Sequence, residues 1–382
     1  MYNFWSVTSS LLFVLAMTAC SSGGNSDDTG SGNEQDNGAD TGDRVESCDA
    51  QSCKPLPSGI YESAGINDPV GNISDSAAVV GVLVRHNWNE CDDEDADADN
   101  IDCLIDAISA DLDAAQAKGV MVNLIVMDGH SAPDFVKQRC TVFDYDKQGS
   151  PAQMCLPWDE NYLADKLALI TALGQFDSHP ALALMYFTGA CSSNGAEGAC
   201  SVDETEYTAA GYTPERLAES YRTIMDMYRT AFPTTPLAFE VHEIFASADL
   251  WQNLWDHVSD GGRVGVASWW CSERLTLSGS NTVGVWPIVQ AAASETFSVC
   301  QTVGNFTLQA WRFTDVALGL DYGQADESTD EQILNAFNDT INWAQGWEIH
   351  ANQTEMIVPY SVIEVWTKDV DNPDFQNRLL QF

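Results

Sequence analysis

Basic residues are scarce in this chain. Its 382 residues include 16 Lys and Arg against 57 Asp and Glu, a formal net charge of −41 at pH 7. Proteins that bind nucleic acid neutralise phosphates with Lys and Arg, so this balance excludes nucleic acid as a partner and disfavours an anionic polysaccharide as a substrate. The excess of acid is typical of a very soluble protein, or of one that works in salty water where salt screens self-repulsion.

Several motifs that carry chemistry are also missing. No Cys-x-x-Cys occurs, which removes the support for a zinc ribbon, a thiol redox site or a c-type haem. No P-loop, no Gly-x-Ser-x-Gly and no early Gly-x-Gly-x-x-Gly is present. His86, His130 and His242 have no metalloprotease spacing, and the Asp-rich segment 91–103 lacks the Gly and final Glu of an EF-hand, so we favour a solvated loop over a calcium site. We therefore expect no metal and no cofactor.

The N-terminus has the pattern of a targeting segment. The apolar run Leu11–Ala16 is too short to span a bilayer, and it leads into Met17-Thr-Ala-Cys20. This ending resembles a bacterial lipobox, although the first ten residues contain no Lys or Arg. The resemblance implies a signal peptide over residues 1–19, lipidation of Cys20 and an exported lipoprotein of the bacterial cell envelope, on the outer membrane and facing the periplasm or the surface.

The segment after Cys20 contains almost no apolar residues. Residues 21–47 are mostly Gly, Ser, Asp and Asn, which cannot form a core. We therefore predict a flexible acidic tether over residues 20–47 and one folded domain over residues 48–382. A tether of this kind would hold the folded domain away from the membrane.

The cysteines suggest an oxidising compartment. The chain has 11 cysteines, and setting Cys20 aside leaves ten that fall into neighbouring couples. Connectivity does not follow from sequence alone, but local pairing is the simplest arrangement. The predicted disulfides are Cys48–Cys53, Cys91–Cys103, Cys140–Cys155, Cys191–Cys200 and Cys271–Cys300.

Apolar strand-like runs alternate with helical patterns along the folded part. Helical spacing of apolar residues is found in 101–118, 161–173, 214–228, 248–258, 286–298 and 331–344. The predicted strands are 58–63, 79–86, 120–127, 181–187, 237–241, 264–269, 306–311 and 356–365. Eight strands alternating with helices predict a single-domain (β/α)8 TIM barrel, whose active site is built by the strand-to-helix loops. A doubly wound sheet is the alternative, with no glycine fingerprint to support it.

Four short motifs carry a family resemblance. They are Gly81-Val-Leu-Val-Arg-His-Asn-Trp88, Lys118-Gly119 before a strand ending Met127-Asp-Gly129, Ala132-Pro-Asp-Phe135, and Leu156-Pro-Trp-Asp159. Together they resemble the catalytic barrel of clan A glycoside hydrolases, in particular the beta-galactosidase-like barrels, over roughly residues 79–370. The resemblance implies hydrolysis of glycosidic bonds by two carboxylates, a general acid/base after strand four and a nucleophile after strand seven.

The two catalytic candidates are Glu197 and Glu364. Glu197 lies in the predicted Cys191–Cys200 loop after strand four, although this strand lacks the family's usual Asn-Glu pair. The predicted strand seven contains no Glu, which leaves Glu364, inside an apolar strand, as the candidate second carboxylate. A buried carboxylate is costly unless it is paired or functional, so Glu364 is either catalytic or pairs with Arg85 or Arg312 to hold the barrel floor.

The substrate-binding candidates gather at predicted strand ends. Tryptophan rings suit the flat faces of sugars, and polar side chains suit sugar hydroxyls. The candidates are Arg85, Asn87, Trp88, His130, Trp158, Glu240, Glu243, Trp269, Glu273 and Trp311.

The sequence thus predicts a glycosidase acting on a neutral oligo- or polysaccharide. The alternative is a non-catalytic surface lipoprotein that binds glycans with a degenerate glycosidase barrel. The absence of a Glu on the predicted strand seven supports this alternative.

Overall fold

The computed structural model describes most of the predicted folded domain. The described residues all lie in the compact unit Val45–Phe382. They are 52–63, 70, 73–91, 101–147, 149–190, 197, 202–269, 271, 284–302, 306, 329–346 and 358–382. The predicted signal peptide, Cys20 and the predicted tether lie outside them.

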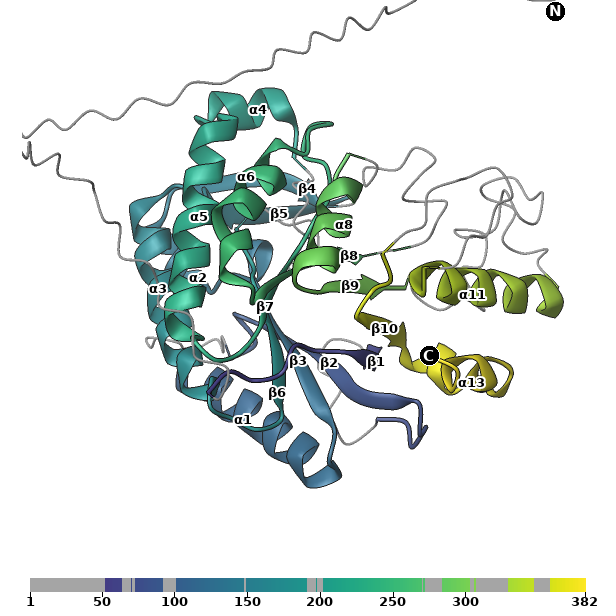
Figure 1. The fold of residues 1–382 in the computed structure, drawn as a ribbon. Helices are drawn as coiled ribbons and strands as arrows, with labels where there is room; N and C mark the ends of the chain where they lie inside the picture. The colour runs from purple at the N-terminus through teal and green to yellow at the C-terminus, as the bar shows by residue number, and fades with distance from the viewer. Residues whose placement is uncertain are drawn as a thin grey trace, which may run out of the picture. The chain divides into compact units, whose positions relative to one another are not determined.

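Eight parallel strands form a closed barrel (Figure 1). Their order around the barrel is β1 (Gly59–Ser63), β10 (Val362–Trp366), β9 (Ser298–Gln301), β8 (Val264–Trp269), β7 (Leu237–Glu240), β6 (Leu182–Tyr186), β3 (Met121–Met127) and β2 (Val79–Asn87). Strand β1 pairs with both β10 and β2, which closes the sheet on itself. The predicted (β/α)8 fold is confirmed.

Helices follow the strands and cover the outside of the barrel, as Figure 1 shows. The longer helices are α1 (Ile101–Lys118), α3 (Glu160–Leu173), α5 (Pro214–Ala231), α6 (Asp249–Val258), α8 (Trp286–Glu295) and α11 (Asp330–Ala344). Shorter ones are α2 (Asp134–Arg139), α4 (Glu204–Ala209), α12 (Thr367–Val370), α13 (Pro373–Leu379) and the 3-10 turns η2 (Gly129–Ser131), η3 (Gly174–Phe176) and η4 (Ser259–Gly261). In the part of the chain that the structure describes, no helix combines the length and apolarity needed to cross a bilayer.

Local sequence signals explain where the main helices begin. The Thr213 side chain accepts a hydrogen bond from the Arg216 N–H, and Pro214 occupies the first turn of α5. Asp159 caps α3 in the same way. These caps satisfy backbone N–H groups that a helix end would otherwise leave unpaired, so each helix starts within a residue of its prediction.

The seventh strand was predicted in the wrong place. The prediction was 306–311, whereas the seventh barrel strand is β9, at Ser298–Gln301. Phe306 has helical backbone, and residues 307–311 lie outside the described part. Strand β9 is only four residues long and half polar, so its apolar signal is weak, and it is recognisable only from its pairing with β8 and β10. The eighth strand starts at Val362 instead of residue 356.

The connection between β3 and α3 contains a hairpin that the sequence did not predict. It consists of β4 (Val142–Lys147) and β5 (Ser150–Cys155), paired antiparallel, and the disulfide Cys140–Cys155 closes its base. The predicted disulfides Cys91–Cys103 and Cys271–Cys300 are also present. The pairs Cys48–Cys53 and Cys191–Cys200 include residues outside the described part.

Side chains fill the inside of the barrel. Tyr61, Leu83, Ile125 and Phe297 belong to this interior layer, which is separate from the larger core between strands and helices. Gly81 makes room for Tyr61, because a Cβ atom at residue 81 would lie 2.4 Å from Tyr61 Cε1. The interior is therefore a packed core and not a channel.

A buried ion pair joins α3 to the barrel wall. The Lys166 Nζ lies 2.6 Å from Asp128 Oδ2, and neither side chain is exposed. The Tyr162 hydroxyl donates to the same carboxylate oxygen at 2.8 Å, and Lys166 also donates to Thr188 Oγ1 at 3.2 Å. Burial disfavours the ammonium, but the Asp128 charge outweighs burial and raises the pKa of Lys166. The helix α3 is thus tied to the ends of both β3 and β6.

We predict that Asp128→Asn lowers the free energy of unfolding by about 3–5 kcal/mol, because it leaves a buried ammonium without a counter-charge. Urea denaturation measures this loss. The matched control is Asp226→Asn, since Asp226 is 46% exposed and pairs with His257 on the surface, where the expected loss is below about 1 kcal/mol. Equal losses in the two variants would contradict the prediction.

Candidate active site

Glu364 lies inside the barrel, where it is held from three other strands. Its side chain is inaccessible to solvent. Asn123 Nδ2 of β3 and the Tyr186 hydroxyl of β6 donate to Oε1 at 3.0 and 2.8 Å, and Gln301 Nε2 of β9 donates to Oε2 at 3.0 Å. Burial raises the pKa of Glu364, against the opposing effect of these hydrogen bonds and of the Arg85 charge. Both carboxyl oxygens are therefore engaged.

Arg85 of β2 connects this carboxyl to two tryptophans. Its guanidinium carbon lies 5.5 Å from the Trp269 ring centroid and 5.2 Å from the Trp366 ring centroid, within the range of cation–π attraction. Nη2 donates to Ser63 Oγ at 2.8 Å. Burial lowers the pKa of Arg85, while the charges of Glu364 and, more weakly, Glu197 act in the opposite direction. Arg85 is thus within electrostatic reach of both predicted catalytic carboxylates.

Glu197 and a Glu–His pair complete this group. Glu197 is 8% exposed and follows β6 in the chain. Glu240 ends β7 and pairs with His242 Nδ1, and Trp251 Nε1 donates to the His242 carbonyl. Burial disfavours charge on His242, but Glu240 and Glu197 outweigh burial and raise its pKa. We call Arg85, Glu197, Glu240, His242, Trp269 and Glu364 the Arg85 cluster.

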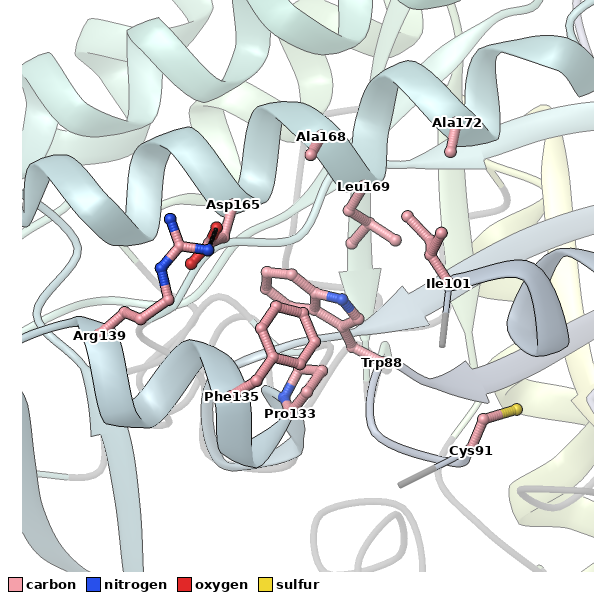
Figure 2. A pocket seen from close by; sticks show the side chains of 10 residues that line it. All are labelled: Trp88, Cys91, Ile101, Pro133, Phe135, Arg139, Asp165, Ala168, Leu169 and Ala172. Carbon is pink, nitrogen blue, oxygen red and sulfur yellow. Dashed lines mark ion pairs between the residues drawn. The ribbon is translucent and has the colours of Figure 1, made fainter. Parts of the chain in front are cut away.

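Some predicted site residues lie elsewhere. Trp88 is 6% exposed and packs in the outer core, beside a cavity of about 310 Å3. Figure 2 shows its indole facing Phe135 and Leu169, with the Arg139–Asp165 ion pair to one side. The Lys166 ammonium lies 5.4 Å from the Trp88 ring. Trp88 therefore supports α3 and does not face the barrel interior.

The remaining candidates are scattered over the loops. Trp158 packs on Tyr207, with ring centroids 5.3 Å apart. Asn87 accepts a hydrogen bond from Ser131 Oγ at 3.0 Å, and Glu243 accepts one from the Gly284 N–H at 2.5 Å. His130 lies in a cleft of the hairpin β4–β5. Glu273 and Trp311 lie outside the described residues, as does Arg312.

Three residues of the centre were not predicted from the sequence. Asn123 is the single polar residue of β3, and because both faces of this strand are apolar, the strand period does not show which face it occupies. Tyr186 was hidden in an apolar run, and Gln301 was missed because strand seven was misplaced. Among the described residues, no group of three His, Cys, Asp or Glu side chains is arranged to hold a metal ion.

His86 alternates with Arg85 and faces the outside of the barrel. Its Nδ1 lies 2.9 Å from Glu90 Oε1, and its Nε2 lies 3.2 Å from Asp111 Oδ2 of α1. Burial disfavours the imidazolium, but Asp111 and Glu90 outweigh burial and raise the pKa of His86 to about 9. A charged His86 therefore joins β2 to α1.

We predict a pH-dependent loss of stability that depends on His86. Because its folded-state pKa is raised, the stabilisation is complete below the ordinary pKa of 6.5 and is lost as pH rises to about 9. The free energy of unfolding should fall by about 3 kcal/mol more over this window in the wild type than in His86→Gln. Denaturation series at several pH values measure the difference, and Glu90→Gln should give an intermediate slope. Parallel wild-type and His86→Gln curves would contradict this.

Comparisons with known proteins found similar structures only. No known family model matches it, and no curated protein matches its sequence. One similar structure is a trimodular endoglucanase of subfamily GH5_4, with a TM-score of 0.45 and 12% identity over 84% of this chain. Another is a psychrophilic family 10 endo-beta-1,4-xylanase, with a TM-score of 0.45 and 11% identity over 83% of this chain and 89% of the xylanase. A third is an old yellow enzyme homologue from Zymomonas mobilis, with a TM-score of 0.43 and 10% identity over 68% of this chain and 84% of that protein.

The likeness is one of fold. This chain spans 56% of the length of the endoglucanase. The chemistry of this chain has to be argued from its own side chains.

Proposed function

We propose that this protein is a glycoside hydrolase that cleaves a neutral oligo- or polysaccharide at the carboxyl end of its barrel. The observation that carries the proposal is the Arg85 cluster, in which the charges of Glu197 and Glu364 act on one guanidinium bordered by Trp269 and Trp366. Two carboxyl groups in different environments and aromatic rings for the sugar face are the parts that glycoside hydrolysis needs.

The roles follow from position and environment. Glu197 is on a loop after the fourth barrel strand and is proposed to protonate the leaving oxygen. Glu364 is proposed as the second carboxylate, with Tyr186, Asn123 and Gln301 fixing its orientation. Glu240, beside His242 at the end of β7, is the alternative second carboxylate. Retention needs a carboxyl separation of about 5–5.5 Å and inversion about 6.5–9.5 Å.

One observation favours a different function. The Glu364 carboxyl is inaccessible, and both of its oxygens already accept hydrogen bonds. A carboxyl in that state suits a residue that holds Arg85 and Tyr186 in place. The sequence offers a similar alternative, in which Glu364 pairs with Arg85 or Arg312 to hold the barrel floor. If Glu364 has this role and Glu240 does not replace it as the second carboxylate, the barrel is a glycan-binding module whose rings bind sugar without cleaving it.

A reducing-sugar assay on neutral polysaccharides separates these cases. We predict that Glu197→Gln lowers kcat by about 10²–10⁴-fold on natural glycosides, and by much less on aryl glycosides whose leaving groups need no proton. Loss of the second carboxylate should lower activity on both substrate types. Glu364→Gln and Glu240→Gln are therefore compared, and the variant that loses activity on both identifies the second carboxylate. Glu219→Gln, an exposed change on α5, is the control.

Two outcomes would overturn parts of this proposal. Full activity in Glu197→Gln on natural glycosides would remove Glu197 from the chemistry. Sugar binding that Trp269→Ala abolishes, with no turnover of any glycoside by the wild type, would establish the binding module instead.

We also propose that the protein is exported and anchored to the cell envelope through lipid on Cys20. The lipobox-like ending Met17-Thr-Ala-Cys20 and the polar residues that follow it support this. Expressed in a bacterium with labelled palmitate, the wild type should incorporate label into the membrane fraction. Cys20→Ser should lose the label, and labelling of that variant at the wild-type level would refute the anchor.

A further inference from the structure

The hairpin β4–β5 forms a cleft in which basic side chains gather, and none of its lining residues belongs to the Arg85 cluster. The cleft has a volume of about 710 Å3. Its lining includes His130, Lys137, Asp144, Tyr145 and Lys147. Lysines are few in this chain, whose net charge is −41. Two of them nevertheless line the same cleft.

Lys147 is bonded to a neutral partner. Its Nζ lies 2.6 Å from His130 Nε2. Burial, together with the charges of Lys147 and Lys137, lowers the pKa of His130 to about 4, so the imidazole is neutral at neutral pH. Among the described residues, no carboxylate forms an ion pair with Lys147, although the chain has 57 Asp and Glu. Burial lowers the pKa of Lys147, and within the described part of the chain its ammonium is held by the imidazole and not by a carboxylate.

Tyr145 also lines the cleft and carries a buried hydroxyl. The residue is 8% exposed, and its hydroxyl has no hydrogen-bond partner in the part of the chain that the structure describes. Burial raises the pKa of Tyr145 to about 12, so the hydroxyl keeps its proton. A buried hydroxyl without a partner is costly, and an acceptor that enters the cleft would remove that cost.

The other charged groups that line the cleft are Lys137 and Asp144. Lys137 Nζ donates to the His130 carbonyl at 2.9 Å, which fixes its ammonium beside the imidazole. The single carboxylate among the described lining residues is Asp144, which accepts a hydrogen bond from Gln153 Nε2 at 2.7 Å. Two ammonium groups and one carboxylate are thus found among the described lining residues.

We propose that this cleft binds an oxyanion carried by a sugar, either a uronic acid carboxylate or a sulfate ester, through Lys147 with Tyr145 and Lys137 beside it. The oxyanion follows from the cleft itself, whereas its attachment to a carbohydrate rests on the proposed function. The substrate would then be a mostly neutral chain that carries an acidic unit away from the bond that is cleaved. The net charge of the chain disfavours an anionic polysaccharide as a substrate, and this proposal revises that expectation. The ammonium groups of the cleft act on a ligand at contact distance, whereas salt screens the more distant carboxylates.

Calorimetric titration of the full-length protein with sodium glucuronate, glucose 6-sulfate and glucose at low salt tests the proposal. We expect binding of glucuronate or of glucose 6-sulfate, with the two arms identifying the oxyanion. Lys147→Gln should weaken it about 10- to 100-fold, and Tyr145→Phe about 3- to 10-fold. Lys147→Arg should retain most of the affinity because it keeps the charge.

Lys118→Gln is the matched control, since it removes the same charge from the exposed end of α1 and should leave binding unchanged. Equal weakening by Lys118→Gln and Lys147→Gln, wild-type affinity in Lys147→Gln, or binding of neither acidic sugar would overturn the proposal. The titration needs no turnover and is repeated on Glu197→Gln. Lys147-dependent binding in a protein without glycosidase activity would therefore sustain this inference while the proposed function fails.

Discussion

A carboxyl group placed inside a barrel has to be matched by donors from the surrounding strands. Glu364 meets this requirement with an amide from β3, a hydroxyl from β6 and an amide from β9, and with the charge of Arg85 on β2. No two of these donors are neighbours in the sequence. The rest of the site depends on this match, because Arg85 is oriented between Glu364, Ser63 and the two tryptophans.

Polar groups on the two sides of the barrel wall serve different purposes. On the inner side, Glu364 acts on the charge of Arg85, and Glu240 pairs with His242. On the outer side, the Lys166–Asp128 pair and the His86 contacts bind helices to strands. Alternation along β2 puts Arg85 and His86 on opposite faces, so one of two adjacent residues belongs to the Arg85 cluster and the other joins the strand to α1.

The order of elements was predictable from the sequence because apolar runs, capping residues and helical spacing are local signals. The helix Ile101–Lys118 was predicted to the residue. What failed was β9, where four residues are held by pairing with neighbours that are distant in the chain. Part of the candidate site was predictable because Arg85, Glu240 and Trp269 lie near the ends of strands that local signals identify. Gln301 was not predictable, because its position depends on locating the seventh strand correctly. Trp88 shows the limit of such reasoning, since a residue at a strand end faces either inward or outward, and here it faces the helices.

The pairing of β1 with β10 joins the first and last strands of the barrel. During synthesis, the first strand therefore has one edge without its partner until the C-terminal strand has emerged, and the closed barrel cannot form earlier. The last strand also carries Glu364, so the donors on β3, β6 and β9 have no acceptor until the same moment. Closure of the barrel and completion of its polar centre are a single event, and a chain shortened before Val362 would lack both.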